Sequence, residues 1–149
     1  MRAVVQRVSE AWVSVNGQRV GAIDQGLLIY LGVHASDQSG DADYLVEKIL
    51  GLRIFEDDAG KMNLSLTQVD GAVLVVSQFT LYGDCRKGKR PSFSEAAAPA
   101  NARELYEYFV SKCNEMGIKT QAGIFGEMMQ VGSVNAGPVT LLLDSHKKF

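Results

Sequence analysis

Alternating apolar and polar positions dominate the first third of the chain and predict β-strands. Residues 3–8 and 11–15 alternate with a period of two, which is typical of strands with one buried face. Asn16-Gly17 is a strong hairpin signal and leads into a further strand at 18–23. Residues 27–33 are apolar almost throughout, so we expect a strand buried on both faces. With 3–8 and 11–15 taken together as the first strand, we predict that the three consecutive strands form an antiparallel meander.

Two segments carry helical periodicity instead. One helix is predicted from Ser39, its expected N-cap, to about residue 52, with apolar side chains on one stripe. The other covers residues 99–116, and Gly117 supplies a C-terminal stop. These helices separate the first strands from those that follow.

The second half of the chain adds more strands. Residues 73–81 form the clearest buried strand, and short strands are predicted at 53–56 and 119–122. A final β region covers 129–143. We therefore predict an α+β fold with mostly antiparallel sheets, which form a barrel-like core, and two main helices. The whole chain, 1–149, is expected to be one domain.

Gly137-Pro138 interrupts this final β region. Proline cannot donate to a strand ladder, so in sheets it is confined to edges, strand starts and bulges. Because apolar residues flank the pair on both sides, we expect a buried position. Local rules broken inside a regular element tend to mark functional or strained sites. An X-Pro bond also reaches the cis form at a cost of only about 0.5–1 kcal/mol.

Composition narrows the possible partners and location. The chain is 46% apolar and 21% charged, with a formal net charge of −2, so a nucleic-acid partner must be held by a local basic patch. No apolar run approaches the ~20 residues of a membrane helix, and the first residues do not form a signal peptide. Two cysteines, Cys85 and Cys113, fit free thiols in a reducing compartment. We expect a cytoplasmic protein with no membrane partner.

Polar and basic residues follow the clearest buried strand. Ser77, Gln78 and Thr80 stand at its end, where a rigid strand can mount site residues, although the strand could also simply run out into solvent. The densest basic cluster comes next and consists of Arg86, Lys87, Lys89 and Arg90. Phosphate contact is the functional interpretation, and a solvated loop is the alternative. Together the two segments indicate a site that meets a nucleotide or an RNA end.

Common catalytic patterns are absent. Neither His34 nor His146 is placed by sequence beside a nucleophile, and metal-ligand spacings and glycine-rich phosphate loops are missing. We therefore expect no metal and no cofactor. Cys85 next to Arg86 has the surroundings that lower a thiol pKa, but a loop cysteine without an evident base is more often incidental. Cys113 falls on the apolar stripe of the second helix and is expected in the core.

Two short segments carry a specific resemblance. Ser77-Gln78-Phe79-Thr80-Leu81 and Asn135-Ala136-Gly137-Pro138-Val139-Thr140 resemble the two signature motifs of the D-aminoacyl-tRNA deacylase family. Residues 1–8 and 90–93, the length and the order of elements also look like that family, so the resemblance covers essentially the whole chain. It implies a cytoplasmic homodimer that hydrolyses the ester between a D-amino acid and the 3′ end of tRNA.

The resemblance also implies roles for individual residues. A cis Gly137-Pro138 bond would reach into the partner subunit's active site, where its carbonyls hold the substrate's α-ammonium and exclude an L side chain. Arg7 would brace this loop. The pocket around the terminal adenosine and the ester would be lined by Ser77, Gln78, Phe79 and Thr80, the substrate-binding set would include Val139 and Thr140, and Phe125 and Met129 would receive the adenine.

The expected chemistry does not need a catalytic triad. An aminoacyl ester is already activated, and one oxyanion donor supplies about 3–4 kcal/mol, or about 10²–10³ in rate. Backbone N–H groups near Phe79 and Thr80 are candidates. RNA brings a 2′-hydroxyl next to the ester, and our hypothesis is that it helps to activate or orient the attacking water. Thr80 as a covalent nucleophile is the rival mechanism. Glycyl-tRNA, which has no side chain to exclude, is a further expected substrate.

Two other function classes stay open at this point. One is a non-catalytic protein that binds RNA ends through the basic loop and an aromatic pocket, which predicts tRNA binding without turnover. The other is a small esterase or thiol enzyme that uses Cys85, which predicts inactivation by alkylation and activity on esters without RNA.

Overall fold

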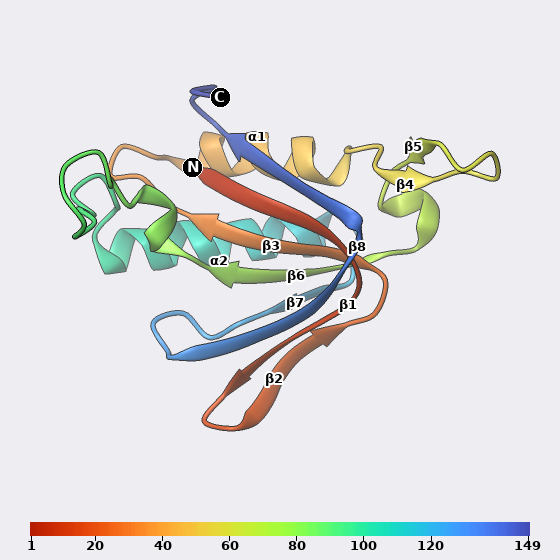
Figure 1. The fold of residues 1–149 in the computed structure, drawn as a ribbon, viewed down its shortest axis with the longest axis horizontal. Helices are drawn as coiled ribbons and strands as arrows, with labels where there is room; N and C mark the ends of the chain where they lie inside the picture. The colour runs from red at the N-terminus through yellow and green to blue at the C-terminus, as the bar shows by residue number, and fades with distance from the viewer.

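The computed structural model describes residues 1–149, with two long helices on one side of the main β-sheet (Figure 1). The helices are α1 (Ser39–Leu50) and α2 (Pro99–Glu115), and two 3₁₀ turns are η1 (Thr67–Val69) and η2 (Phe79–Tyr82). The strands are β1 (Arg2–Val15), β2 (Gln18–Ile23), β3 (Gly26–Gly32), β4 (Phe55–Glu56), β5 (Met62–Leu64), β6 (Ala72–Ser77), β7 (Thr120–Ala122) and β8 (Met129–Asp144). The predicted α+β class is confirmed.

The long strand β1 organises the sheet. The strand order is β2-β1-β3-β6-β7, and β8 also pairs with β1. All three partners of β1 are antiparallel to it, whereas the β3–β6 and β6–β7 pairs are parallel. The predicted meander is wrong, because β3 pairs with the first half of β1 and not with β2. Exposed residues 9–10 lie at a register shift within β1.

Apolar side chains gather in two clusters. The larger contains 23 buried residues and lies between the sheet and the two helices, with Leu45 and Ile49 from α1 and Phe109 from α2 fully buried. The smaller contains seven buried residues, including Val13 and Leu74, where β2 curls against β6 and β7. This curl gives the sheet its barrel-like shape (Figure 1). Neither long helix is long and apolar enough to cross a membrane.

Element ends differ from the expected ones in two places. The predicted strand at 73–81 stops at Ser77, and the chain turns there into η2. Ser39 is the first residue of α1 rather than its cap, which is Gln38, whose N–H donates to Asp41 Oδ2 at 2.9 Å. Cys113 is fully buried in the larger cluster, as predicted, and burial raises the pKa of its thiol to about 12.

Candidate active site

The end of β6 is fixed against β3 before the chain enters η2. The Gln78 N–H donates to the Leu31 carbonyl at 2.8 Å. Gly32 lies beneath the turn, and a Cβ atom there would be only 3.0 Å from the Gln78 carbonyl oxygen. A glycine at this position therefore allows η2 to pack directly on the sheet.

Two backbone donors of η2 have no acceptor within the chain. The Phe79 and Thr80 N–H groups make no hydrogen bond, because the first bond of the turn runs from Leu81 N–H to the Gln78 carbonyl. Beside them, the Gln78 side-chain amide donates to the Thr80 hydroxyl. The Phe79 ring is 57% exposed and lies edge-on to Phe93, with 5.1 Å between ring centroids. The turn thus presents a short polar backbone surface next to an exposed aromatic pair.

The basic loop follows η2 but only part of it is free of acidic partners. Arg86 donates two hydrogen bonds to the Asp84 carboxylate, from Nε to Oδ1 at 2.8 Å and from Nη2 to Oδ2 at 2.7 Å. These hydrogen bonds lower the pKa of the Asp84 carboxyl to about 2. The remaining cations of the cluster, Lys87, Lys89 and Arg90, are exposed and have no acidic side chain within ion-pair distance.

Two residues are expected to receive an adenine. Phe125 lies in the loop between β7 and β8, and Met129 is the first residue of β8. Gly123 N–H and the Tyr106 hydroxyl both donate to the Val75 carbonyl, each at 2.9 Å, so this segment is tied to the last residues of β6. The Phe125 ring lies 5.8 Å from that of Tyr106, and both line a pocket of about 490 Å³ against α2. Met129 packs on Gly123. The loop that carries Phe125 and the start of β8 therefore lie at the same end of β6 as η2 (Figure 1).

The second signature segment forms a bulge in β8. Pairing with β1 stops at Asn135, opposite Val8, and resumes at Thr140, opposite Gln6. The Asn135 side chain closes the bulge, because its amide donates to the Thr140 hydroxyl at 2.9 Å and its oxygen accepts from Val139 N–H at 3.2 Å. The Gly137-Pro138 bond inside the bulge is cis, as expected. Proline is thus accommodated where the ladder is interrupted.

Arg7 holds the bulge from beneath. Its Nε donates to the Ala136 carbonyl at 3.0 Å and its Nη1 to the Ile54 carbonyl at 2.7 Å, and the residue is only 8% exposed. Glu56 lies 3.8 Å from Nη2. Gly137 has φ +124, and a Cβ there would be 2.8 Å from the same Nη2 atom. The arginine therefore lies in van der Waals contact with the loop that it anchors.

The predicted burial of this segment is wrong for the single chain. Gly137 and Pro138 are exposed, and of residues 136–139 only Val139 is buried. The pairing that would have covered the pair is missing, because β8 has β1 on one edge and no strand on the other.

One chain does not bring the two signature segments together. Ser77 pairs with Leu31, which pairs through Ala3 with Leu143. Pro138 precedes Leu143 by five residues, which corresponds to roughly 16 Å along a strand. Figure 1 shows η2 and the bend of β8 at opposite ends of the sheet.

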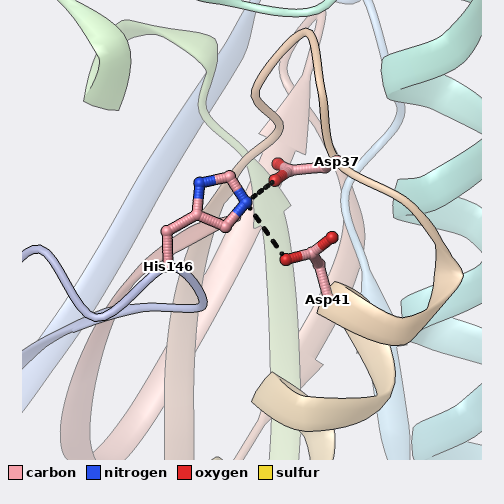
Figure 2. Close-up of side chains that lie close together, drawn as sticks. All are labelled: Asp37, Asp41 and His146. Carbon is pink, nitrogen blue, oxygen red and sulfur yellow. Dashed lines mark ion pairs between the residues drawn. The ribbon is translucent and has the colours of Figure 1, made fainter.

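A further polar cluster lies beside the first residues of the chain and was not predicted. His146 Nε2 lies 3.2 Å from both Asp37 Oδ1 and Asp41 Oδ1 (Figure 2). The Met1 amino group donates to Asp37 Oδ1 at 2.7 Å and also to Ser145. Asp37, Asp41 and His146 are residue types that can bind a metal ion, and here the Met1 amino group contacts the cluster through Asp37. Nothing local in the sequence indicates such a cluster, because its members come from three distant segments.

Comparisons with known proteins point to one family and one fold. The model of the protein family described as D-Tyr-tRNA(Tyr) deacylase matches residues 4–144. A D-aminoacyl-tRNA deacylase of Desulfatibacillum aliphaticivorans is 63% identical over 97% of this chain and 99% of its own, and one of Koribacter versatilis is 61% identical over both full lengths. A solved structure described as c-Myc DNA Unwinding Element Binding Protein is 38% identical, with a TM-score of 0.91 over 97% of this chain and 98% of that one.

Proposed function

Because the chain belongs to the D-Tyr-tRNA(Tyr) deacylase family and is a hydrolase of D-aminoacyl-tRNA, we propose that η2 provides its reaction centre. The supporting observation is the pair of N–H groups of Phe79 and Thr80, which have no acceptor within the chain. Such donors stabilise the oxyanion that forms when water adds to an ester carbonyl. Ser77 and Gln78 would add polar side chains beside these donors.

In this mechanism, water attacks the ester carbonyl carbon and the bond to the 3′ oxygen of the terminal adenosine breaks. A proton passes to that oxygen, which releases the D-amino acid and the tRNA. The adjacent 2′-hydroxyl helps to activate or orient the water, so that no side chain acts as the essential base. Thr80 as a covalent nucleophile is the alternative, because its hydroxyl lies in the same turn and accepts from Gln78.

The tRNA end would contact the surfaces that surround η2. Phe125 and Met129 would receive the adenine, since both are anchored at the same end of β6. Phosphates would contact the basic loop of Arg86, Lys87, Lys89 and Arg90. Within this set, Arg86 already has a carboxylate partner, so the other three are the stronger candidates.

Chiral selection would come from a second copy of the chain. Gly137-Pro138 is exposed on a bulge far from η2 of its own chain, so only a partner's bulge could reach that turn. The outer edge of β8 is unpaired, and Leu142 and Val134 on this strand are 62% and 47% exposed. A homodimer that covers this strand would place backbone carbonyls of the bulge and the exposed Thr140 against the substrate's α-carbon, whereas Val139, whose side chain is buried in the core, would contribute only its backbone. Because glycine has no side chain to exclude, glycyl-tRNA would also be a substrate. The protein would act in the cytoplasm.

Ester loss from D-Tyr-tRNA and L-Tyr-tRNA tests the proposal, with a third substrate whose terminal adenosine is 2′-deoxy. We expect rapid loss from the D substrate, negligible loss from the L substrate, and a large reduction for the deoxy substrate. An undiminished rate on the deoxy substrate would refute the 2′-hydroxyl role. Binding without turnover would indicate an RNA-end binder, and inactivation by alkylation of Cys85 would indicate a thiol enzyme.

A further inference from the structure

Arg2 connects the first residues of the chain to the turn that carries the proposed reaction centre. Its Nη1 donates to the Leu81 carbonyl at 3.1 Å, and its Nε donates to Asp144 Oδ2 at 3.0 Å. The guanidinium also stacks on the Tyr82 ring, with 4.5 Å between Cζ and the ring centroid. One side chain therefore contacts two successive residues of η2.

The Leu81 carbonyl has no other donor. Within η2, the carbonyls of Gln78 and Thr80 accept from Leu81 and Gly83, but no backbone N–H reaches that of Leu81. Arg2 thus satisfies an acceptor near the C-terminal end of the turn, where a positive charge is also favoured by the peptide dipoles. The free N–H groups of Phe79 and Thr80 lie at the opposite end of the same turn.

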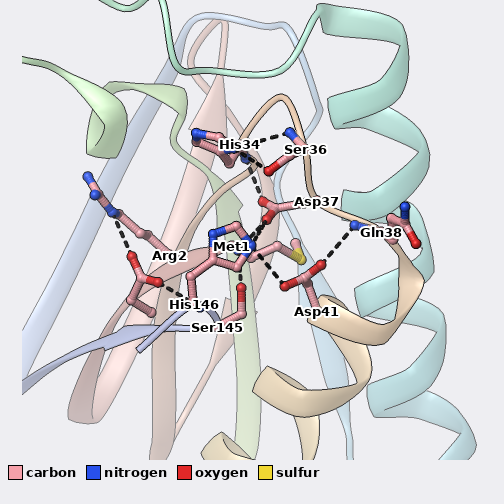
Figure 3. Close-up of polar contacts among 10 residues, drawn as sticks. Met1, Arg2, His34, Ser36, Asp37, Gln38, Asp41, Ser145 and His146 are labelled. Atoms are coloured by element: carbon pink, nitrogen blue, oxygen red, sulfur yellow. Dashed lines mark hydrogen bonds and ion pairs between the residues drawn. The ribbon is translucent and has the colours of Figure 1, made fainter. Parts of the chain in front are cut away.

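The other end of Arg2 is held rigidly. Asp144 has a side chain that is only 2% exposed, and its second oxygen accepts from His146 N–H at 2.7 Å. His146 in turn contacts Asp37 and Asp41, and the Met1 amino group donates to Asp37 (Figure 3). The backbone of Arg2 is therefore fixed on both sides, by its own strand pairing and by this cluster, and its side chain has a defined direction.

We propose that Arg2 is a positioning residue for hydrolysis, which sets the orientation of η2 and so the direction of the Phe79 and Thr80 N–H groups. The inference rests on the proposed function, since it concerns the turn assigned to the oxyanion. Arginine suits the role because its planar fork reaches the Leu81 carbonyl and the Asp144 carboxylate at once. Lysine keeps the charge but offers a single point of contact.

The test compares Arg2→Gln, Arg2→Lys and a matched control, Arg53→Gln, in the full chain. Arg53 also donates to a backbone carbonyl, that of Asn63 at 2.8 Å, but on the β4–β5 arm. Because a small misplacement of reacting groups costs up to about 10²-fold in rate, we expect Arg2→Gln to lower kcat on D-Tyr-tRNA at least about tenfold, with KM within about twofold. Arg2→Lys should recover part of the loss, and Arg53→Gln should match the wild type.

A second readout separates positioning from a purely structural role. In ¹⁵N-labelled protein, the amide resonances of Phe79 and Thr80 should shift in Arg2→Gln and return partway in Arg2→Lys, but stay in place in Arg53→Gln. An unchanged kcat, or a lower kcat with unmoved Thr80 and Phe79 resonances, overturns the proposal. If Arg2→Gln does not fold, the comparison of Arg2→Lys with wild type decides by the same criteria. A wild-type protein without hydrolysis would refute the proposed function, while the resonance shifts would still report whether Arg2 orients the turn.

Discussion

The two signature segments use the backbone in opposite ways. Around η2, two N–H groups are left without acceptors, so the segment offers donors to an anion. In the β8 bulge, residues 136–139 leave the strand ladder, and in the proposed mechanism this segment would offer carbonyls to a cation. An aminoacyl ester has both needs, because its carbonyl becomes an oxyanion next to a positively charged α-amino group.

The side chains around each segment act as supports. Gln78 holds the Thr80 hydroxyl, and Arg2 holds the Leu81 carbonyl. Across the sheet, Arg7 holds the Ala136 carbonyl and Asn135 closes the bulge. In the proposed mechanism, neither histidine is needed at either segment. It also means that changes to backbone geometry should harm activity more than changes to hydroxyl or amide groups.

Gly137→Ala is expected to have the largest effect. The added Cβ would lie 2.8 Å from Arg7 Nη2 and 3.0 Å from Val139 Cγ2, at a φ of +124 that L side chains rarely adopt. We expect kcat/KM on D-Tyr-tRNA to fall by about 10²-fold or more, since the bulge must shift. Gly60→Ala, at φ +71 with open space around it, is the matched control for backbone strain alone. Equal losses in the two variants, measured together with melting temperatures, would show that the bulge is not part of the site.

Arg7→Gln should have a smaller effect on rate and a clear effect on selectivity. Hydrogen bonds from a charged donor contribute about 1.5–3 kcal/mol each, and the variant leaves the Ala136 and Ile54 carbonyls without the guanidinium. We expect about a tenfold loss in kcat/KM on D-Tyr-tRNA and a measurable rate on L-Tyr-tRNA, because the bulge loses its anchor. Undiminished discrimination between the two substrates would refute the bracing role.

Much of the fold could be predicted because it depends on local patterns. The alternation of the first strands, the apolar stripes of both helices and the Asn16-Gly17 turn are all local signals, and each element formed. The pairing between strands could not be predicted from such local patterns. Residues 9–10 interrupt the apolar–polar alternation, yet the chain continues as one strand because β8 pairs along nearly its whole length.

The candidate site shows the same limit. The motifs predicted Ser77–Thr80 and Gly137-Pro138 as site residues, which stays a prediction, and the restriction on proline in sheets correctly predicted an irregular strand. Burial of the pair could not be inferred, since flanking apolar residues do not reveal whether another strand covers them. Arg2 and the cluster around His146 gave no sequence signal, because their contacts join distant parts of the chain: Arg2 bonds to Asp144, 142 residues away, and Met1 to Ser145, 144 residues away.

The basic loop should contribute less to activity than Gly137 or Arg7, and its individual cations should contribute unequally to tRNA binding. Lys89→Gln removes a cation without an acidic partner, whereas Arg86→Gln removes one already paired with Asp84. Removing a cation that binds one phosphate should reduce the slope of log K against log salt by about 1. We expect KM to rise several-fold and the salt slope to fall in Lys89→Gln, and only weak changes in Arg86→Gln. The salt dependence of KM measures both, and an equal response would show that the Asp84 pair opens when RNA binds.

Thr80→Ala is expected to lower kcat only modestly, and it separates the two mechanisms for η2. If the backbone N–H groups and the 2′-hydroxyl carry the reaction, loss of the Thr80 hydroxyl removes only its hydrogen bond with Gln78. One neutral hydrogen bond contributes about 0.5–1.5 kcal/mol, so kcat should fall by about tenfold at most. Thr80→Ser, which keeps the hydroxyl, should lie between the variant and wild type. Near-complete loss in Thr80→Ala with retention in Thr80→Ser would instead identify a nucleophile. A single-turnover experiment with acid quench, which traps an aminoacyl-enzyme if one forms, would then decide between a covalent step and direct attack by water.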